Sequence, residues 1–265
     1  MKFNKEYTKY WTSAVDKSID GTIIAGPNEA KYFLDLISIK SSDSILDLGC
    51  SFGRMFDLLS SYSKNIFGVD PDKYAVEKAK KKEYVKVLQG VAEKTGFQEN
   101  FFDLIFCWAT FDVVNHSQGL SEFNRLIKTN GKLLITGKNS NYYDDDILAF
   151  KAEKNAFIKD FPNKFTNLDT LLKNFGKFGF NLIDLFLFPK RGDFGKLNFE
   201  LTNPKLNKSN ICYEYLIICE KCSDITQNIT NINGLDQISS ETAGRLAKKQ
   251  GFSNAKEIFE SIGID

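Results

Sequence analysis

From residue 44 onward, short β-prone runs alternate with amphipathic segments of helical periodicity. The β-prone runs cover residues 44–49, 65–70, 85–89, 102–108, 132–137, 181–188 and 211–219. Strand-like runs that alternate with helical segments are typical of parallel sheets whose crossover connections are helices. The sequence therefore predicts an α/β fold with a doubly wound, mostly parallel sheet of seven strands.

Two segments interrupt this alternation. Residues 139–166 are long, aromatic and rich in acids, and we expect them to form a lid insertion over the carboxyl edge of the sheet, where such folds bind ligands. Residues 223–238 are rich in Ser, Thr and Asn and predict a linker, after which residues 239–265 return to helical patterns. The expected organisation is one domain over residues 1–222, then the linker and a small helical C-terminal appendage.

Composition narrows the class of protein. The 265 residues carry 35 Lys and Arg against 34 Asp and Glu, whereas a nucleic-acid-binding domain normally carries a basic excess. No apolar run approaches the roughly 20 residues of a membrane span, and residues 1–11 lack the pattern of a secretory signal. Five cysteines are too few and too odd in number for a disulfide scaffold. We expect a cytoplasmic protein with neither nucleic acid nor membrane as partner.

The first predicted strand ends in a glycine-containing turn, and the second ends in an acid. Gly49 and Gly53 flank Ser51, and Asp70 closes the second strand. Glycines in such a turn let a ligand approach the backbone, and a carboxylate at the end of the next strand can accept both hydroxyls of a ribose. Dinucleotide folds carry G-x-G-x-x-G instead, and Asp47 would repel a pyrophosphate but attract an ammonium group. The pattern therefore predicts a pocket for a nucleoside without a phosphate.

Five motifs, in order, resemble those of class I S-adenosylmethionine-dependent methyltransferases. Residues 47–53 (DLGCSFG) resemble the first motif of that family, D-x-G-x-G-x-G, and Asp70 resembles its ribose-binding acid. Residues 89–93 (QGVAE), 102–107 (FDLIFC) and 126–133 (LIKTNGKL) resemble the later motifs. S-adenosylmethionine carries an amino group and a sulfonium but no phosphate. The resemblance implies this cofactor, the seven-stranded fold and methyl transfer as the reaction.

Three departures from the family pattern leave the pocket in place. Ser51 replaces the middle glycine, Val91 replaces the acid that usually faces adenine, and Thr129-Asn130 replaces Pro-Gly in a later turn. An aromatic N-terminal segment that includes Trp11 resembles the one that folds over the cofactor in many small-molecule members. The resemblance implies cofactor contacts from Trp11, Asp47, Gly49, Cys50, Ser51, Gly53, Asp70, Pro71, Val91, Ala92, Cys107 and Trp108.

Candidate catalytic residues follow the fourth predicted strand, a segment that runs along the methyl-donor side of the pocket in the family. His116 is the sole histidine, and its usual pKa suits proton removal near neutrality; Asp112 is the rival base. A hydroxyl acceptor needs such a base, whereas an unprotonated amine does not. We expect methyl transfer to a hydroxyl of a small polar metabolite, such as a nucleotide-linked or polysaccharide sugar. The alternatives are N-methylation of a small amine and a catalytically silent scaffold with the same fold.

No metal site is expected. The run of acids at residues 144–146 fits the N-terminal charge of a helix that starts at Ile147 better than a cation site. Cys219 and Cys222 have a zinc-like spacing, but no second pair accompanies them. The apolar positions of residues 239–265 are too few for an independent core. The appendage is therefore expected to dock on the main domain or on another copy of the chain, and the second arrangement would give a homo-oligomer.

Overall fold

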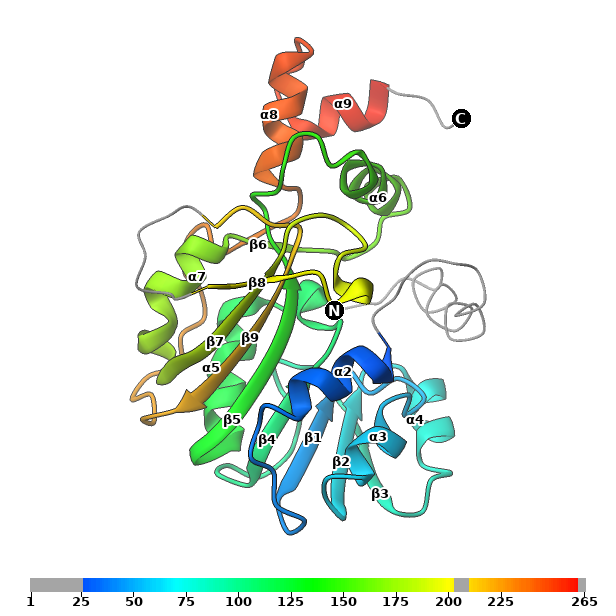
Figure 1. Cartoon of the computed structure of the whole chain (residues 1–265), viewed down its shortest axis with the longest axis vertical. Helices are drawn as coiled ribbons and strands as arrows, with labels where there is room; N and C mark the ends of the chain where they lie inside the picture. The colour runs from blue at the N-terminus through cyan, green and yellow to red at the C-terminus, as the bar shows by residue number, and fades with distance from the viewer. Residues whose placement is uncertain (1–25, 203–209, 262–265) are drawn as a thin grey trace.

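The computed structural model describes residues 26–202 and 210–261 (Figure 1). A sheet of eight strands runs through the molecule in the order β3-β2-β1-β4-β5-β9-β7-β8. The first five strands in this order pair in parallel, whereas β9 is antiparallel to both of its neighbours. The predicted doubly wound, mostly parallel sheet is therefore confirmed. The strands are β1 (Ser44–Leu48), β2 (Asn65–Asp70), β3 (Val85–Gln89), β4 (Phe102–Cys107), β5 (Ile127–Lys138), β7 (Phe180–Phe188), β8 (Glu200–Thr202) and β9 (Glu214–Lys221).

The sheet has one strand more than the seven predicted. The additional strand, β8, has three residues and pairs antiparallel with β7 at the edge of the sheet. Three residues are too few to display the alternation that marks a strand, so the sequence indicated only a polar connection there. Each of the seven predicted runs corresponds to a strand.

Helices cover both faces of the sheet. One face carries α2 (Pro27–Leu34), α3 (Phe56–Ser60) and α4 (Lys73–Ala79), and the other carries α5 (His116–Leu126) and α7 (Leu168–Asn174). Three short 3-10 turns complete the layers: η1 (Phe111–Val113), η2 (Phe175–Phe178) and η3 (Phe194–Lys196). In the described part of the chain, no helix combines the length and the apolar character needed to cross a membrane.

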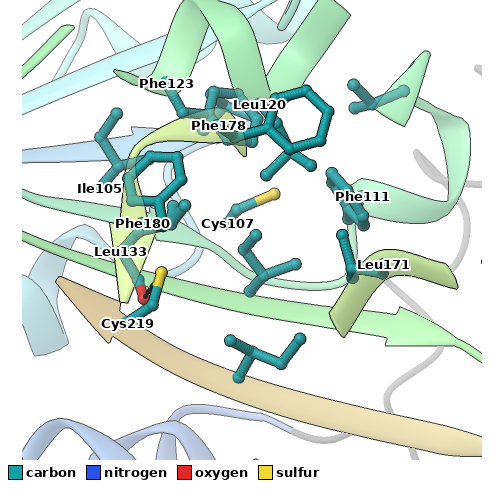
Figure 2. Close-up of a cluster of buried hydrophobic side chains, with 14 of the residues drawn as sticks. Ile105, Cys107, Phe111, Leu120, Phe123, Leu133, Leu171, Phe178, Phe180 and Cys219 are labelled. Carbon is teal, nitrogen blue, oxygen red and sulfur yellow. Dashed lines mark hydrogen bonds between the residues drawn. The ribbon is translucent and has the colours of Figure 1, made fainter. Parts of the chain in front are cut away.

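The larger apolar cluster lies between the sheet and helices α5 and α7 (Figure 2). Cys107, at the end of β4, lies among Phe111, Leu120 and Phe178, and all four side chains are fully buried. Burial of this face anchors the end of β4 and the η1 turn that follows it. The loop that leaves β4 is consequently fixed where it packs against this cluster. The part of the loop that does not pack there can line a pocket.

Three helices form a cap at one end of the molecule (Figure 1). The predicted lid supplies α6 (Ile147–Ile158), whereas the predicted appendage supplies α8 (Glu241–Lys249) and α9 (Ala255–Ser261). Phe150 and Phe157 of α6 lie against Phe259 of α9, with ring centroids 5.7 and 5.1 Å apart. The appendage therefore docks on the lid of its own chain.

A buried carboxylate joins the lid to the appendage. Glu153 of α6 accepts hydrogen bonds from the Tyr142 hydroxyl at 2.6 Å and from the backbone N–H of Ser240 at 2.6 Å. The Ser240 hydroxyl donates a further bond to it at 2.7 Å. Because Ser240 is also the N-cap of α8, these bonds fix where α8 begins.

The segment between β9 and α8 lies along α5. The Ser121 hydroxyl donates to the carbonyl of Ile229 at 3.0 Å, and the N–H of Ile232 donates to the Ser117 hydroxyl at 2.9 Å. Its last residues form β10 (Asp236–Gln237), which pairs antiparallel with β6 (Phe165–Thr166). The segment that composition predicts as a linker is thus packed on the sheet domain, while the division into domains stays a prediction.

Candidate functional site

A cavity of about 130 Å³ opens at the carboxyl ends of β1, β2 and β4. The loops that leave these parallel strands meet at one edge of the sheet, which is where doubly wound folds bind ligands. Every lining residue lies between Asp47 of β1 and Val114, which follows η1. The lining consists of Asp47, Leu48, Gly49, Cys50, Ser51, Phe52, Arg54, Met55, Val69, Asp70, Pro71, Asp72, Ala75, Gly90, Val91, Ala92, Glu93, Trp108, Ala109, Thr110, Val113 and Val114.

The turn after β1 forms the floor of this pocket. Gly49 has a φ of +78°, and a Cβ on it would lie 2.3 Å from the hydroxyl oxygen of Thr110, so only glycine fits here. Ser51 also adopts a left-handed conformation, with a φ of 48°. Its N–H donates to Asp70 Oδ2 at 2.9 Å, which ties the turn to the end of β2. The turn therefore presents its backbone to a ligand.

Asp70 is held by backbone donors but keeps acceptor capacity. Its Oδ2 accepts from Ser51 and its Oδ1 accepts from the N–H of Asp72 at 2.9 Å, which leaves a second lone pair on each oxygen. Burial raises the pKa of this carboxyl to about 6, against the lowering effect of the two N–H donors. A fixed carboxylate of this kind can accept the hydroxyls of a ribose.

Asp47 is the most unusual side chain of the pocket. It is only 3% exposed, and its Oδ2 has no hydrogen-bond partner among the described residues. Burial raises its pKa from 3.8 to about 7; the nearby charge of Arg54 lowers that pKa, and the charge of Asp70 raises it. A buried acceptor without a donor costs free energy, so this carboxylate is suited to a ligand that brings a donor or a positive charge.

The wall opposite the turn comes from the loop after β3. Val91 and Ala92 line it with small apolar side chains and backbone groups. Glu93 also lines it, and its Oε1 accepts from the N–H of Asn115 at 2.6 Å. Asn115 is in turn the N-cap of α5, so Glu93 connects this wall to the segment that follows β4.

The segment after β4 forms the remaining wall. Trp108 stacks on Phe106 at a centroid distance of 5.4 Å and is only 3% exposed. Ala109 has a φ of 52°, and its N–H donates to the Thr136 hydroxyl of β5 at 2.7 Å. The hydroxyl of Thr110 donates to the carbonyl of Trp108 at 3.1 Å. This wall is therefore rigid and mostly apolar.

Most of the predicted cofactor residues lie on the pocket lining, and two do not. Gly53 supports the turn: its φ is +79°, and a Cβ there would lie 2.4 Å from the ring of Phe56. Cys107 points to the opposite face of the sheet, into the cluster of Figure 2. Trp11 lies outside the described residues. Those on the lining are Asp47, Gly49, Cys50, Ser51, Asp70, Pro71, Val91, Ala92 and Trp108.

Neither of the two predicted bases lines the pocket. His116 is fully buried and stacks on Phe111 at a centroid distance of 4.3 Å, and neither ring nitrogen has a hydrogen-bond partner among the described residues. Burial lowers its pKa to about 4, although the charge of Asp236 opposes this shift. Asp112 is mostly buried and forms an ion pair with Lys138 of β5. The structure thus places the side chains of His116 and Asp112 outside the pocket lining.

Sequence reasoning missed four polar side chains of the lining: Arg54, Asp72, Glu93 and Thr110. Arg54 directly follows the glycine turn, and Glu93 lies inside the third motif. Their position beside predicted ligand-binding residues was the available signal. What the sequence does not reveal is which way each side chain points.

The three consecutive acids of the lid, residues 144–146, each interact with different groups. Asp144 forms ion pairs with Arg245 and Lys249, Asp145 forms one with Lys190, and Asp146 caps α6. In the part of the chain that the structure describes, no group of three His, Cys, Asp or Glu residues could hold a metal ion.

Known proteins are most informative for the part of the chain that carries the pocket. A family model described as a methyltransferase domain matches residues 46–135, a stretch that contains the whole lining. An uncharacterised protein of Methanocaldococcus jannaschii is 29% identical over 136 residues, which are 50% of this chain and 59% of that protein. The uncharacterised methyltransferase YcgJ of Bacillus subtilis is 27% identical over 123 residues, 44% of this chain and 49% of its own length. The chain thus spans about half the length of these relatives.

Solved structures share the fold at low identity. A S-adenosylmethionine-dependent methyltransferase of Thermotoga maritima, described as a possible histamine N-methyltransferase, aligns with a TM-score of 0.59 at 20% identity. The alignment covers 82% of this chain and 99% of that one. Geranyl diphosphate methyltransferase, solved in complex with S-adenosylmethionine, aligns with a TM-score of 0.57 at 13% identity over 74% of this chain and 85% of its own. Residues 46–135 are thus similar to a methyltransferase domain, and the chain shares the fold of solved S-adenosylmethionine-dependent methyltransferases.

Proposed function

We propose that this protein transfers a methyl group from S-adenosylmethionine to a small polar acceptor. The observation that carries the proposal is that the buried Oδ2 of Asp47, which has no hydrogen-bond partner among the described residues, lines the same pocket as the held carboxylate of Asp70. The first suits an ammonium group and the second suits ribose hydroxyls. No phosphate is called for, because the lining carries four carboxylates, Asp47, Asp70, Asp72 and Glu93.

The lining offers a suitable group for each part of the cofactor. Asp70 would accept the ribose hydroxyls, and Val91 and Ala92 would pack on the adenine, with their backbone groups taking the place of the family's usual acid. Asp47 would receive the amino group. When bound there, the cofactor supplies a methyl group on an electrophilic sulfonium. The protein's part is then to align the acceptor beside Trp108 and Thr110 and to exclude water.

Whether the acceptor is a hydroxyl or an amine depends on a base. The sequence favours a hydroxyl, including that of a sugar, with His116 or Asp112 as the base. Both side chains lie off the pocket lining, and an amine that is already deprotonated needs no base. This arrangement supports amine methylation as the second candidate, and the Thermotoga maritima neighbour is described in the same terms.

Calorimetry with S-adenosylmethionine and adenosylhomocysteine, followed by turnover assays with labelled cofactor, tests the proposal. The acceptor panel pairs each sugar or polyol with its amino analogue. We expect micromolar binding of both cofactor forms and methyl transfer to one series. Binding without transfer to any acceptor in cell extracts would support the silent scaffold, and absence of binding would refute the proposal.

A further inference from the structure

A buried carboxylate of α5 holds the loop that follows β3. Glu122 is only 9% exposed, and its Oε1 accepts hydrogen bonds from the N–H of Thr95 at 2.9 Å and from the Thr95 hydroxyl at 2.8 Å. Arg125, one turn further along α5, donates to both oxygens of this carboxylate at 2.8 and 2.7 Å. Glu122 does not line the pocket, so any effect it has on a ligand passes through Thr95.

Thr95 lies against the loop segment that lines the pocket. The N–H of Lys94 donates to the carbonyl of Val91 at 3.0 Å, which closes a turn over residues 91–94, and the first three of these residues line the pocket. The carbonyl of Thr95 packs on Gly90, the residue before this turn, since a Cβ on Gly90 would lie 2.9 Å from that oxygen. A shift of Thr95 would therefore displace the turn at both of its ends.

The first two residues of this turn offer a ligand only backbone polar groups. Val91 and Ala92 have apolar side chains, and the N–H of Ala92 donates to no described residue. A carboxylate on a side chain can adjust its direction through its rotamers, whereas a backbone N–H points where the loop directs it. Because hydrogen bonds weaken steeply away from a straight geometry, recognition by backbone groups requires that the loop be held in place.

We propose that Glu122 is a positioning residue for recognition of the adenine ring, and that it acts through Thr95 on the turn of residues 91–94. The inference rests on the proposed function, because it takes S-adenosylmethionine to be the ligand of the pocket. The selectivity of the pocket for adenine then depends on a side chain of α5 that the ligand does not touch.

The charge of Glu122 strengthens its hold on Thr95. Burial alone would raise the pKa of this carboxyl, but Arg125 and the two donors of Thr95 keep that pKa below its usual value. The carboxylate is therefore ionised at neutral pH, and hydrogen bonds to an ionised acceptor are the stronger kind.

Two further bonds keep the loop attached when Glu122 is removed. Glu93 accepts from the N–H of Asn115 at 2.6 Å, and the carbonyl of Phe97 accepts from Arg125 at 2.9 Å. Loss of Glu122 should therefore loosen the turn without detaching the whole loop.

Binding measurements on paired ligands test this without any turnover. The pair is adenosylhomocysteine and its inosine analogue, in which a carbonyl replaces the 6-amino group and N1 carries a proton. Calorimetry on the unaltered protein should show adenosylhomocysteine binding at least about tenfold more tightly, because the analogue presents the wrong donors and acceptors. Glu122→Ala should weaken adenosylhomocysteine about 3- to 10-fold and the analogue less than about twofold, so that the ratio falls.

Two conservative variants separate positioning from a general loss of stability. Glu122→Gln keeps one oxygen that can accept from Thr95, so it should restore part of the ratio. Thr95→Val keeps the shape of the side chain and removes only its hydroxyl donor, so it should lower the ratio less than Glu122→Ala does. If Glu122→Ala does not fold, Thr95→Val carries the test.

Asp103→Ala is the matched control. Asp103, near the start of β4, accepts from the N–H of Ser44 at 2.8 Å and from Lys128 at 2.7 Å, at the end of the strands opposite the pocket. This variant also removes a carboxylate that holds a backbone N–H and a basic side chain. It should lower the melting temperature and leave the ratio of the two affinities unchanged.

The outcomes distinguish the proposed function from the role of Glu122. If the unaltered protein binds neither ligand, both fail. If it binds the two ligands equally, if the Glu122 and Thr95 variants keep the ratio, or if Asp103→Ala lowers it as much, the role of Glu122 is overturned while the cofactor pocket stands. A fall in the ratio confined to the Glu122 and Thr95 variants supports it.

Discussion

Replacing Asp47 by Asn should stabilise the unliganded protein and weaken cofactor binding. The carboxyl of Asp47 has its pKa raised from 3.8 to about 7, with burial as the main cause. A raised pKa means that the folded state holds the proton more tightly than the unfolded state. The stability that this provides is fully present below pH 3.8 and is lost as the pH rises to about 7.

The magnitude follows from the shift. Each pKa unit corresponds to about 1.4 kcal/mol, so a shift of roughly three units costs the folded protein at most about 4 kcal/mol above pH 7. At pH 5 the same reasoning gives about 1.6 kcal/mol. Asn has no charge to desolvate, so Asp47→Asn should raise the free energy of unfolding relative to the unaltered protein, and by more at pH 8 than at pH 5.

Urea unfolding of the unliganded protein at pH 5 and pH 8 measures this difference. Asp57→Asn is the control: Asp57 is exposed and paired with Lys82, and that pairing lowers its pKa. This control should slightly destabilise the protein above pH 4, which is the opposite sign. Calorimetry should show weaker adenosylhomocysteine binding by Asp47→Asn only. The reasoning fails if Asp47→Asn is destabilising at pH 8, or if its effect does not grow with pH.

Three further changes probe other parts of the molecule. Asp70→Ala should weaken S-adenosylmethionine and adenosylhomocysteine alike by about 1.5 to 3 kcal/mol, because hydrogen bonds to a charged acceptor are lost; unchanged titrations would contradict the ribose role. Removal of residues 239–265 should expose Phe150 and Phe157 and leave Glu153 without its Ser240 donors, so light scattering should detect aggregation or a new oligomer while cofactor affinity changes less than about twofold. His116→Phe should protect the protein against acid unfolding between pH 6.5 and about 4, since the buried imidazole resists protonation there. It should also lower kcat less than about tenfold, and a loss of a hundredfold or more with an altered pH profile would restore His116 as the base.

The sheet could be predicted because its signals are local. Runs such as residues 65–70 and 102–108 are short, β-prone and bounded by turn residues, and they correspond to β2 and β4. β8 could not be found in this way, because three residues carry no period. The packing of residues 223–235 was equally hidden. Their polar composition is typical of a linker, and the hydroxyls of Ser117 and Ser121 that bind their backbone lie over a hundred positions away.

The turn of the site could be predicted for a similar reason. The positive φ of Gly49 and the closeness of Thr110 both exclude a side chain at this position. A glycine in the sequence is therefore a direct signal of such a turn. Cys107 and Trp108 show the limit. Successive strand residues point to opposite faces, so at most one of the two could face the pocket, and only the packing of Cys107 against Phe111 and Leu120 decides which. His116 follows η1, whose orientation likewise depends on tertiary packing.

The charges of the pocket connect stability with function. A fold selected for stability alone would pair Asp47 with Arg54 or replace both by apolar residues, because a buried charge without a partner costs more than the hydrophobic alternative. The sequence instead holds Asp70, Asp72 and Glu93 with backbone donors and leaves Asp47 and Arg54 apart. Ligand binding would relieve that cost, so cofactor saturation should raise the melting temperature by more than it does in Asp47→Asn. An equal rise in both proteins would mean that the ligand does not meet Asp47.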